Sequence, residues 1–299
     1  MTAHPSPRIG IAFVPTLAPE RLRSLATAAD AARLDELWVW EDCFKQSGIA
    51  SAAAALAWTD ELTVGIGLLP VPLRNVALTA MELATLERMA PGRLVAGIGH
   101  GVQPWMEQVG ARVESPLTLL REYTDALRRL LDGETVTATG RYVTLTEVAL
   151  DWPPVAPPPL MLGGTGPRSL ALAAELGDGL LLANDRTLAE VEQAAGVVGR
   201  GAAASREGRR AALVATLIVA TGPGAEQRVA EEIPRWGRSP EPGMGVAGDA
   251  ATIGAGIRRL AASGATSVCL QPTEDEPDLL GLVRFLGEEV RPLVLADGG

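Results

Sequence analysis

Residues 62–101 read LTVGIGLLPVPLRNVALTAMELATLERMAPGRLVAGIGHG and contain the signals that decide the fold. Two short apolar runs, 62–69 and 93–98, are rich in branched side chains and predict buried strands. The segment between them, 76–89, has helical spacing and ends at Pro91-Gly92, a helix-stop signal. Because strands joined by a helical crossover run parallel, this stretch predicts one strand–helix–strand unit of a parallel sheet.

The same alternation continues along the chain on both sides of this unit. Helical segments separate eight apolar runs that predict strands: 8–14, 36–40, 62–69, 93–98, 160–162, 179–182, 211–220 and 267–271. Eight such units close naturally into an α/β fold, the (β/α)8 TIM barrel, and a single barrel domain accounts for residues 1–299. A doubly wound open sheet is the alternative, but no G-x-G-x-x-G follows the first strand.

One region interrupts the alternation before the fifth strand. Residues 134–150 have β character around a Thr-Gly-Arg turn, which predicts a β-hairpin, and 151–159 read DWPPVAPPP, a proline-rich linker. We therefore expect an insertion at about 134–159 that lies over the barrel.

Composition restricts the partners and the compartment. The net charge of −10 argues against a nucleic-acid partner and against an anionic membrane surface. The longest apolar stretch, 211–220, is too short to span a membrane, and the N-terminus has no apolar signal-peptide core. Two cysteines, Cys43 and Cys269, and two histidines cannot form a closed Cys/His zinc site, so no metal and a cytoplasmic location are expected.

Catalytic groups of a barrel come from the carboxyl ends of its strands, and two such ends carry candidate proton-handling groups. Glu41 and Asp42 follow the second strand and could act as acid, base or ligand, although an acidic residue before a helix is also a common N-cap. His100 follows the fourth strand between Gly99 and Gly101, where an imidazole could exchange protons near neutral pH or be purely structural.

Glycines mark two further strand ends. Gly65 and Gly67 lie inside the third strand, which indicates either close approach of a ligand or crowding inside the barrel. Residues 163–168 read GGTGPR, a glycine-rich turn that opens a helix and could bind an anion with help from Arg168. A structural tight turn is the alternative for this segment.

These motifs together resemble the luciferase-like monooxygenase family, which includes bacterial luciferase, flavin-dependent monooxygenases and deazaflavin-dependent reductases. The resemblance spans about residues 8–295 and is strongest in 62–101, with a helix containing ELATL, then GR and a glycine-rich strand end. The second matching stretch is 159–182, PLMLGGTGPRSLALAAELGDGLLL.

The resemblance implies a cofactor laid across the strand ends, either coenzyme F420 or, as the alternative, FMN. It implies that the insertion helps cover this cofactor and that a non-proline cis peptide occurs near the end of the third strand. The residues implied in cofactor binding are Gly67 and Leu68 under the ring, Gly99 and Gly101 at its other edge, and Gly163, Gly164, Thr165, Gly166 and Arg168 at its phosphate.

One position departs from the family pattern. Deazaflavin enzymes of this type commonly carry Asp-His after the second strand, where this chain has Glu41-Asp42. The sequence therefore predicts an oxidoreductase of an unidentified small organic substrate, in which Glu41, Asp42 and His100 handle protons, with a homodimer as the expected assembly. A non-catalytic cofactor-binding barrel is the main alternative. A hydrolase or aldolase barrel would need a nucleophile, and Lys45 is the single lysine available for a Schiff base.

Overall fold

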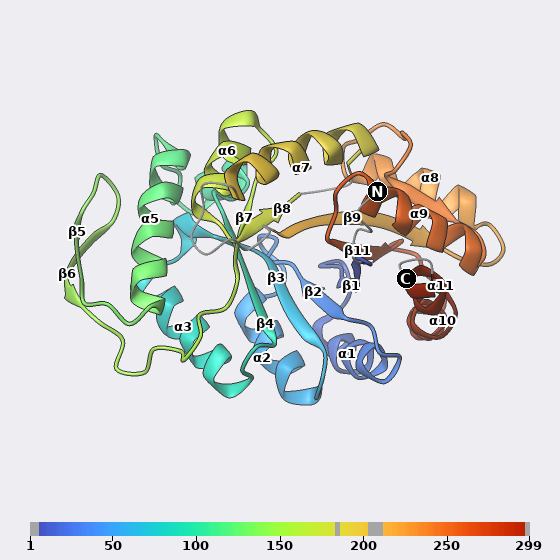
Figure 1. Ribbon diagram of the computed structural model, residues 1–299, viewed down its shortest axis with the longest axis horizontal. Helices are drawn as coiled ribbons and strands as arrows, with labels where there is room; N and C mark the ends of the chain where they lie inside the picture. Colours follow the sequence, from blue (N-terminus) through green and yellow to red (C-terminus); the bar gives the residue numbers. More distant parts are fainter. Residues whose placement is uncertain (1–5, 183–185, 203–211, 297–299) are drawn as a thin grey trace.

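Eight parallel strands, all within the described residues, close into a barrel surrounded by helices (Figure 1). The computed structural model describes residues 6–182, 186–202 and 212–296. Closure follows from the pairings of the seventh strand with both the sixth and the eighth, and of the eighth with the first. This confirms the predicted barrel and excludes the open sheet. In chain order the barrel strands are β1 (Arg8–Phe13), β2 (Glu36–Val39), β3 (Thr63–Pro70), β4 (Leu94–Gly99), β7 (Leu160–Gly163), β8 (Gly179–Leu181), β9 (Ala212–Ala220) and β11 (Ser267–Pro272).

The helices begin and end at residues that the sequence marks. Asn75 caps α3 by accepting a hydrogen bond from the backbone N–H of Ala77 at 2.9 Å, and Gly92 follows that helix with a φ of 74°. Pro116 and Pro167 begin their helices at the first turn, where proline loses no backbone bond. The helices are α1 (Leu22–Ala31), α2 (Gly48–Trp58), α3 (Val76–Met89), α4 (Gln103–Gln108), α5 (Pro116–Leu131), α6 (Pro167–Leu176), α7 (Leu188–Ala202), α8 (Ala225–Arg235), α9 (Ala250–Ala262), α10 (Leu279–Phe285) and α11 (Arg291–Ala296).

The insertion forms the predicted hairpin, but its position differs from the expected one. Strands β5 (Val136–Thr139) and β6 (Thr144–Val148) pair antiparallel and project beyond α5 at the edge of the molecule (Figure 1). Glu122 on α5 accepts the backbone N–H groups of Arg141, Tyr142 and Val143, which fixes the turn to the outer face of that helix. The expectation that this segment lies over the barrel and covers its strand ends is therefore wrong.

Three short elements were not predicted. Helix α4 occupies the loop after β4, and β10 (Gly245–Ala247) pairs with the carboxyl half of β9, beyond the point where β8 ends. The last helix, expected at about 277–290, begins as α10, ends in a π-helical turn, Leu286–Val290, and is followed by α11, which lies beyond the expected end. Ala211, the predicted start of the seventh strand, lies outside the described residues. Within the described ranges no helix is long and apolar enough to cross a membrane.

The core has two layers. The larger layer lies between the strands and the surrounding helices, and the smaller one fills the barrel interior around the buried indole of Trp38. Gly65 and Gly67 face this indole, and a Cβ built on Gly65 would lie within 2.5 Å of three atoms of the ring. For Gly65, crowding inside the barrel is therefore sufficient to explain the glycine.

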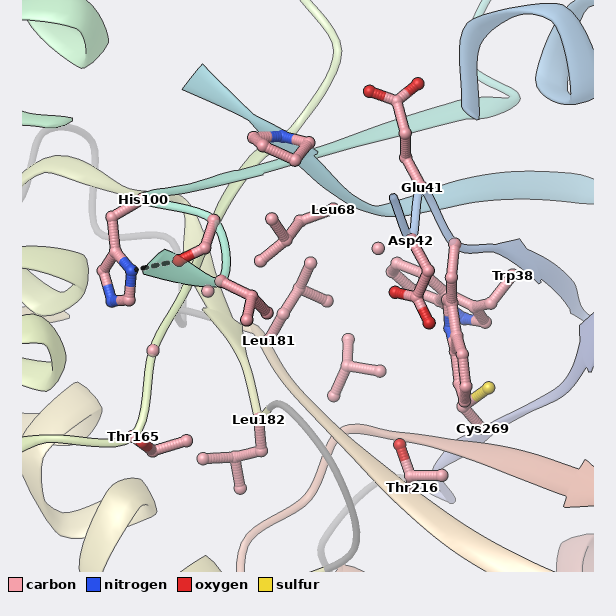
Figure 2. A pocket seen from close by; sticks show the side chains of 18 of the residues that line it. Trp38, Glu41, Asp42, Leu68, His100, Thr165, Leu181, Leu182, Thr216 and Cys269 are labelled. Carbon is pink, nitrogen blue, oxygen red and sulfur yellow. Dashed lines mark hydrogen bonds between the residues drawn. The ribbon is translucent and has the colours of Figure 1, made fainter. Parts of the chain in front are cut away.

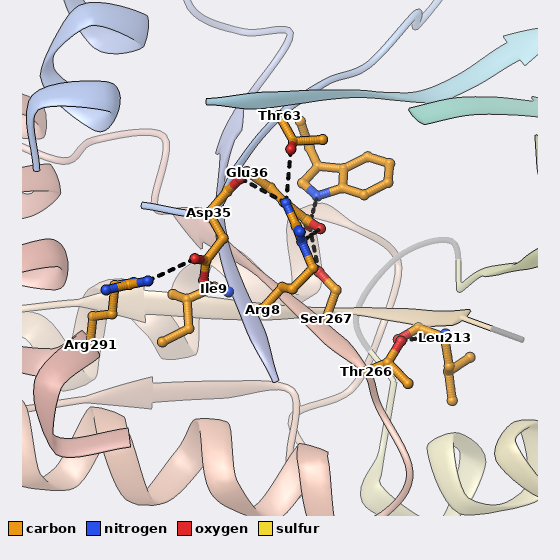
Figure 3. A network of polar contacts seen from close by, with 10 residues as sticks. Arg8, Ile9, Asp35, Glu36, Thr63, Leu213, Thr266, Ser267 and Arg291 are labelled. Carbon is orange, nitrogen blue, oxygen red and sulfur yellow. Dashed lines mark hydrogen bonds and ion pairs between the residues drawn. The ribbon is translucent and has the colours of Figure 1, made fainter. Parts of the chain in front are cut away.

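A polar network closes the amino end of the barrel (Figure 3). The carboxylate of Glu36, which is 3% exposed, accepts hydrogen bonds from Trp38 Nε1 at 2.7 Å, Ser267 Oγ at 2.6 Å and Arg8 Nε at 2.5 Å. Arg8 also donates to Thr63 Oγ1 at 2.8 Å. The buried Glu36 carboxylate thus links the first residues of β1, β2 and β11, Arg8 extends the network to β3, and Trp38 forms the floor above it.

Candidate active site

A cavity of about 440 Å³ opens at the carboxyl ends of the barrel strands (Figure 2). This volume lies in the range of small-molecule and cofactor sites. Its floor is formed by Trp38, Thr216 and Cys269, and Leu68, Leu181 and Leu182 make much of its wall apolar. The predicted site residues that line it are Glu41, Asp42, Gly67, Leu68, His100, Gly101, Gly163, Gly164 and Thr165.

The two acidic residues after β2 have different surroundings. Glu41 accepts hydrogen bonds from the Gly48 backbone at 2.7 Å and from Arg74 Nη2 at 3.0 Å, and its carboxylate points away from Asp42 (Figure 2). The Asp42 carboxylate points into the cavity. Partial burial raises the pKa of Asp42, and the nearby Lys45 ammonium opposes that rise. Asp42 is therefore the acidic group best placed to reach a ligand in the cavity.

His100 lies across the cavity from Asp42, with Leu68 and Leu181 between them in Figure 2. Its Nδ1 is 2.9 Å from the carbonyl oxygen of Gly101. Because a carbonyl oxygen only accepts, Nδ1 carries the proton, and a neutral ring then presents Nε2 as an acceptor. The structure thus does not bring Asp42 and His100 together as one catalytic pair.

Leu68 forms an apolar platform in the cavity wall. The Gly67–Leu68 peptide bond is cis, as the family resemblance implies, and a second non-proline cis bond joins Cys43 and Phe44. A Cβ on either Gly99 or Gly163 would overlap the Leu68 side chain. Gly99 itself does not line the cavity, so its contribution is the space that it leaves for Leu68.

The glycine-rich turn before α6 meets the cavity only at its beginning. Gly163, Gly164 and Thr165 line it, whereas Gly166 and Arg168 do not, and the Arg168 side chain is exposed. A Cβ on Gly164 would lie 2.5 Å from that of Ser169, so this position also requires the absence of a side chain.

Twelve of the lining residues were not predicted from the sequence, among them Trp40, Trp105, Arg235 and Trp236. A signal for Trp40 was present, since it is the last residue of LWVW, directly before Glu41. Trp105 lies on α4, a segment that the sequence predicts as a loop. Arg235 is the last residue of α8 and Trp236 follows it, and nothing in the local sequence there indicates a cavity.

The family model for luciferase-like monooxygenases matches residues 6–268, which is most of the chain. The chain belongs to the luciferase-like monooxygenase family. Among the curated relatives of this luciferase-like protein, the 5,10-methylenetetrahydromethanopterin reductase of Archaeoglobus fulgidus is 32% identical over 176 residues, covering 58% of this chain and 52% of the relative. The enzyme of the same description from Methanolobus tindarius is 30% identical over 174 residues, covering 58% and 53%. The aligned region thus spans about half the length of these relatives.

Solved structures agree with the family assignment at the level of the fold. An F420-dependent secondary alcohol dehydrogenase in complex with an F420–acetone adduct superposes with a TM-score of 0.85 at 20% identity, covering 97% of this chain and 99% of that one. At this identity the likeness describes the luciferase-like barrel alone.

The raised pKa of Asp42 leads to a prediction for the stability of this luciferase-like protein. A carboxyl whose pKa is higher in the folded state stabilises the fold fully below its unfolded pKa, and that contribution is lost as pH rises through the folded pKa. We therefore expect Asp42→Asn to raise the melting temperature at pH 7, with the gain shrinking as pH falls into the ordinary carboxyl range. Calorimetry of both proteins from about pH 3 to about pH 8 measures this difference, since this range includes the ordinary pKa values of carboxyl groups. A gain that is independent of pH would contradict it.

Proposed function

We propose that this protein is an oxidoreductase that uses coenzyme F420 and acts on a small organic substrate. The observation that carries the proposal is the strand-end cavity, in which an apolar platform at Leu68 and the turn Gly163–Thr165 line the same space. The family membership supports the reaction class, and relatives described as F420-dependent support the cofactor, including an F420-dependent hydroxymycolic acid dehydrogenase of Mycobacterium tuberculosis that is 29% identical over 215 residues.

The residues present fit such a cofactor. Leu68 would support the ring, because the absence of side chains at Gly99 and Gly163 leaves room for the Leu68 side chain in the cavity wall. Gly163, Gly164 and Thr165 would hold the phosphate end at the start of α6, where backbone N–H groups favour anions. Gly67 and Gly101 line the same cavity. Gly166 and Arg168 lie outside it and would contact a bound cofactor that extends along the turn.

Glu41, Asp42 and His100 were all expected to handle protons, and the proposal gives that role to Asp42 alone. Reduced F420 supplies a hydride when it is bound. A carbonyl substrate that gains a hydride at carbon must also gain a proton at oxygen, and Asp42 would donate it, since its carboxyl group points into the cavity and burial raises its pKa. Glu41 would orient the loop through Arg74 and Gly48, and His100 would contact the ligand from the opposite wall.

Cofactor binding tests the proposal directly. We expect purified protein to bind F420 with a Kd below about 100 μM, measured by titration of the cofactor fluorescence. Gly163→Ala should weaken binding at least about tenfold, since the added Cβ overlaps Leu68 and displaces the platform. The matched control is Gly199→Ala on α7, where an added Cβ meets nothing within 4 Å, and the affinity should be unchanged.

Each outcome separates the candidates. Binding of FMN without F420 would replace the proposed cofactor by the alternative, and a Kd above about 100 μM for both would contradict the function altogether. Tight binding without turnover of any ketone or secondary alcohol would favour the non-catalytic barrel.

The proposal also covers the domain organisation, the assembly and the compartment. We treat residues 1–299 as one barrel domain with an insertion at about 134–159, and a homodimer as the expected assembly. The chain has only two cysteines and no C-x-x-C pair, which supports a cytoplasmic location, and the negative net charge supports the absence of nucleic-acid and membrane partners.

A further inference from the structure

Tryptophans from three separate elements line the cavity. Trp40 follows β2, Trp105 lies on α4 and Trp236 follows α8. The rings of Trp40 and Trp236 meet edge to face, with centroids 5.6 Å apart and planes at 87°. Two residues distant in the sequence thus form one aromatic wall, which we define as Trp40 and Trp236, and Trp40 lies two positions before Asp42 in the chain.

The positive charge of Arg235, next to this wall, is already paired with two carboxylates. Arg235 is the only arginine or lysine among the described residues that line the cavity. Its Nη1 lies 3.1 Å from Glu232 Oε2 and 3.0 Å from Glu274 Oε2, so two carboxylates surround one guanidinium. An anionic substrate would have to compete with both carboxylates for this cation.

Glu232 holds the wall in place. Its side chain is 3% exposed, and it accepts hydrogen bonds from Trp236 Nε1 at 2.9 Å and from the Glu274 backbone at 3.1 Å, in addition to Arg235. The same carboxylate therefore fixes the orientation of the Trp236 ring and withdraws Arg235 from the ligand. A wall fixed before binding loses little conformational entropy when a flat ligand packs against it.

We propose that the substrate of this site is a flat, uncharged aromatic or conjugated carbonyl compound or alcohol that packs against the aromatic wall. Glu232 acts as a positioning residue for Trp236. This deepens the proposed function and rests on it for the reaction, whereas recognition of the ring depends only on the wall. Ring–ring packing favours aromatic ligands beyond the area that they bury.

Three methyl ketones of similar size provide the test: acetophenone, cyclohexyl methyl ketone and 4-acetylbenzoate. Their affinities for the F420-loaded protein are measured by ligand-detected NMR titration. We expect acetophenone to bind about tenfold more tightly than either of the others, because only it is both aromatic and uncharged. Equal affinity of the two uncharged ketones, or tightest binding of 4-acetylbenzoate, would overturn the inference.

Variants connect this preference to the wall. Trp236→Leu and, as a second variant, Trp40→Leu should reduce the preference for acetophenone over cyclohexyl methyl ketone to below about threefold while F420 affinity stays the same. The matched control is Trp152→Leu, a 71% exposed tryptophan on the insertion, which should keep the full preference. Folding of each variant is checked by circular dichroism, and retention of the preference in both wall variants would overturn the inference.

Glu232 is tested by the same ratio of affinities. Glu232→Ala should lower the aromatic preference and shift the tryptophan fluorescence, and Glu232→Gln, which keeps an oxygen acceptor for Trp236 Nε1, should restore most of the preference. A loss of overall stability alone would not change the ratio, so an unchanged ratio in Glu232→Ala contradicts the positioning role. If F420 does not bind but the protein without cofactor still prefers acetophenone, the proposed function fails and the recognition stands.

Discussion

Asp42→Asn should lower the turnover of the F420-loaded protein by about 10²–10⁴-fold, the range typical of losing a general acid. The amide keeps the size and polarity of the side chain but cannot donate the proton that a reduced carbonyl oxygen needs. Rates are measured with F420 in its reduced form and a panel of neutral ketones, by following the return of the oxidised cofactor spectrum. The F420 Kd should stay within a few-fold of the wild-type value.

Two comparisons make this result specific to Asp42. Lys45→Ala removes the positive charge that lowers the pKa of Asp42. The rate at low pH should therefore stay the same, and the fall in rate at high pH should move to a higher pH. Asp60→Asn changes an exposed aspartate at the far end of α2, after Trp58, and should leave turnover unchanged. Wild-type turnover in Asp42→Asn would show that the proton comes from another group, with His100 as the next candidate.

Glu36→Ala should lower the free energy of unfolding by about 2–5 kcal/mol. The change leaves two buried donors, Trp38 Nε1 and Ser267 Oγ, without their acceptor, at a cost of roughly 1–3 kcal/mol each. The ion pair with Arg8 adds less, because the Arg8 side chain is 51% exposed and solvent screens it. Guanidinium unfolding followed by circular dichroism measures the difference.

The controls separate the lost acceptor from a general effect of the substitution. Glu36→Gln keeps one oxygen acceptor and should lose less stability than Glu36→Ala. Glu61→Ala removes an exposed glutamate after α2 and should change stability by less than about 0.5 kcal/mol. A Glu36→Ala protein that unfolds at the wild-type denaturant midpoint would contradict a structural role for the network.

Features that depend on local sequence could be predicted, whereas features that depend on contacts between distant residues could not. The strands and long helices were predictable because their apolar spacing is local. Helix α3 has the predicted bounds 76–89, and α6 has the bounds 167–176 that Pro167 and Gly177 predict. The place of the hairpin was not, because it depends on Glu122 of α5, whose three backbone partners lie about twenty residues further along. Local sequence gives no sign of a bond at that separation.

The candidate site divides in the same way. Gly163, Gly164 and Thr165 could be predicted, since a glycine-rich turn at a strand end is a local pattern. The different surroundings of Glu41 and Asp42 depend on Arg74, which approaches from the segment after β3. Trp236 reaches the cavity only because α8 packs over β9 and β10, a tertiary arrangement with no counterpart in its own sequence.

The floor made by Trp38 and Glu36 has a kinetic consequence. With the amino end of the barrel filled by an indole and a hydrogen-bonded carboxylate, ligands exchange with solvent through the opposite end. Cofactor and substrate would then share one route, and whichever lies deeper has to arrive first and leave last. The barrel floor therefore favours a compulsory order of addition and release, in which the outer reactant comes and goes while the inner one stays in place.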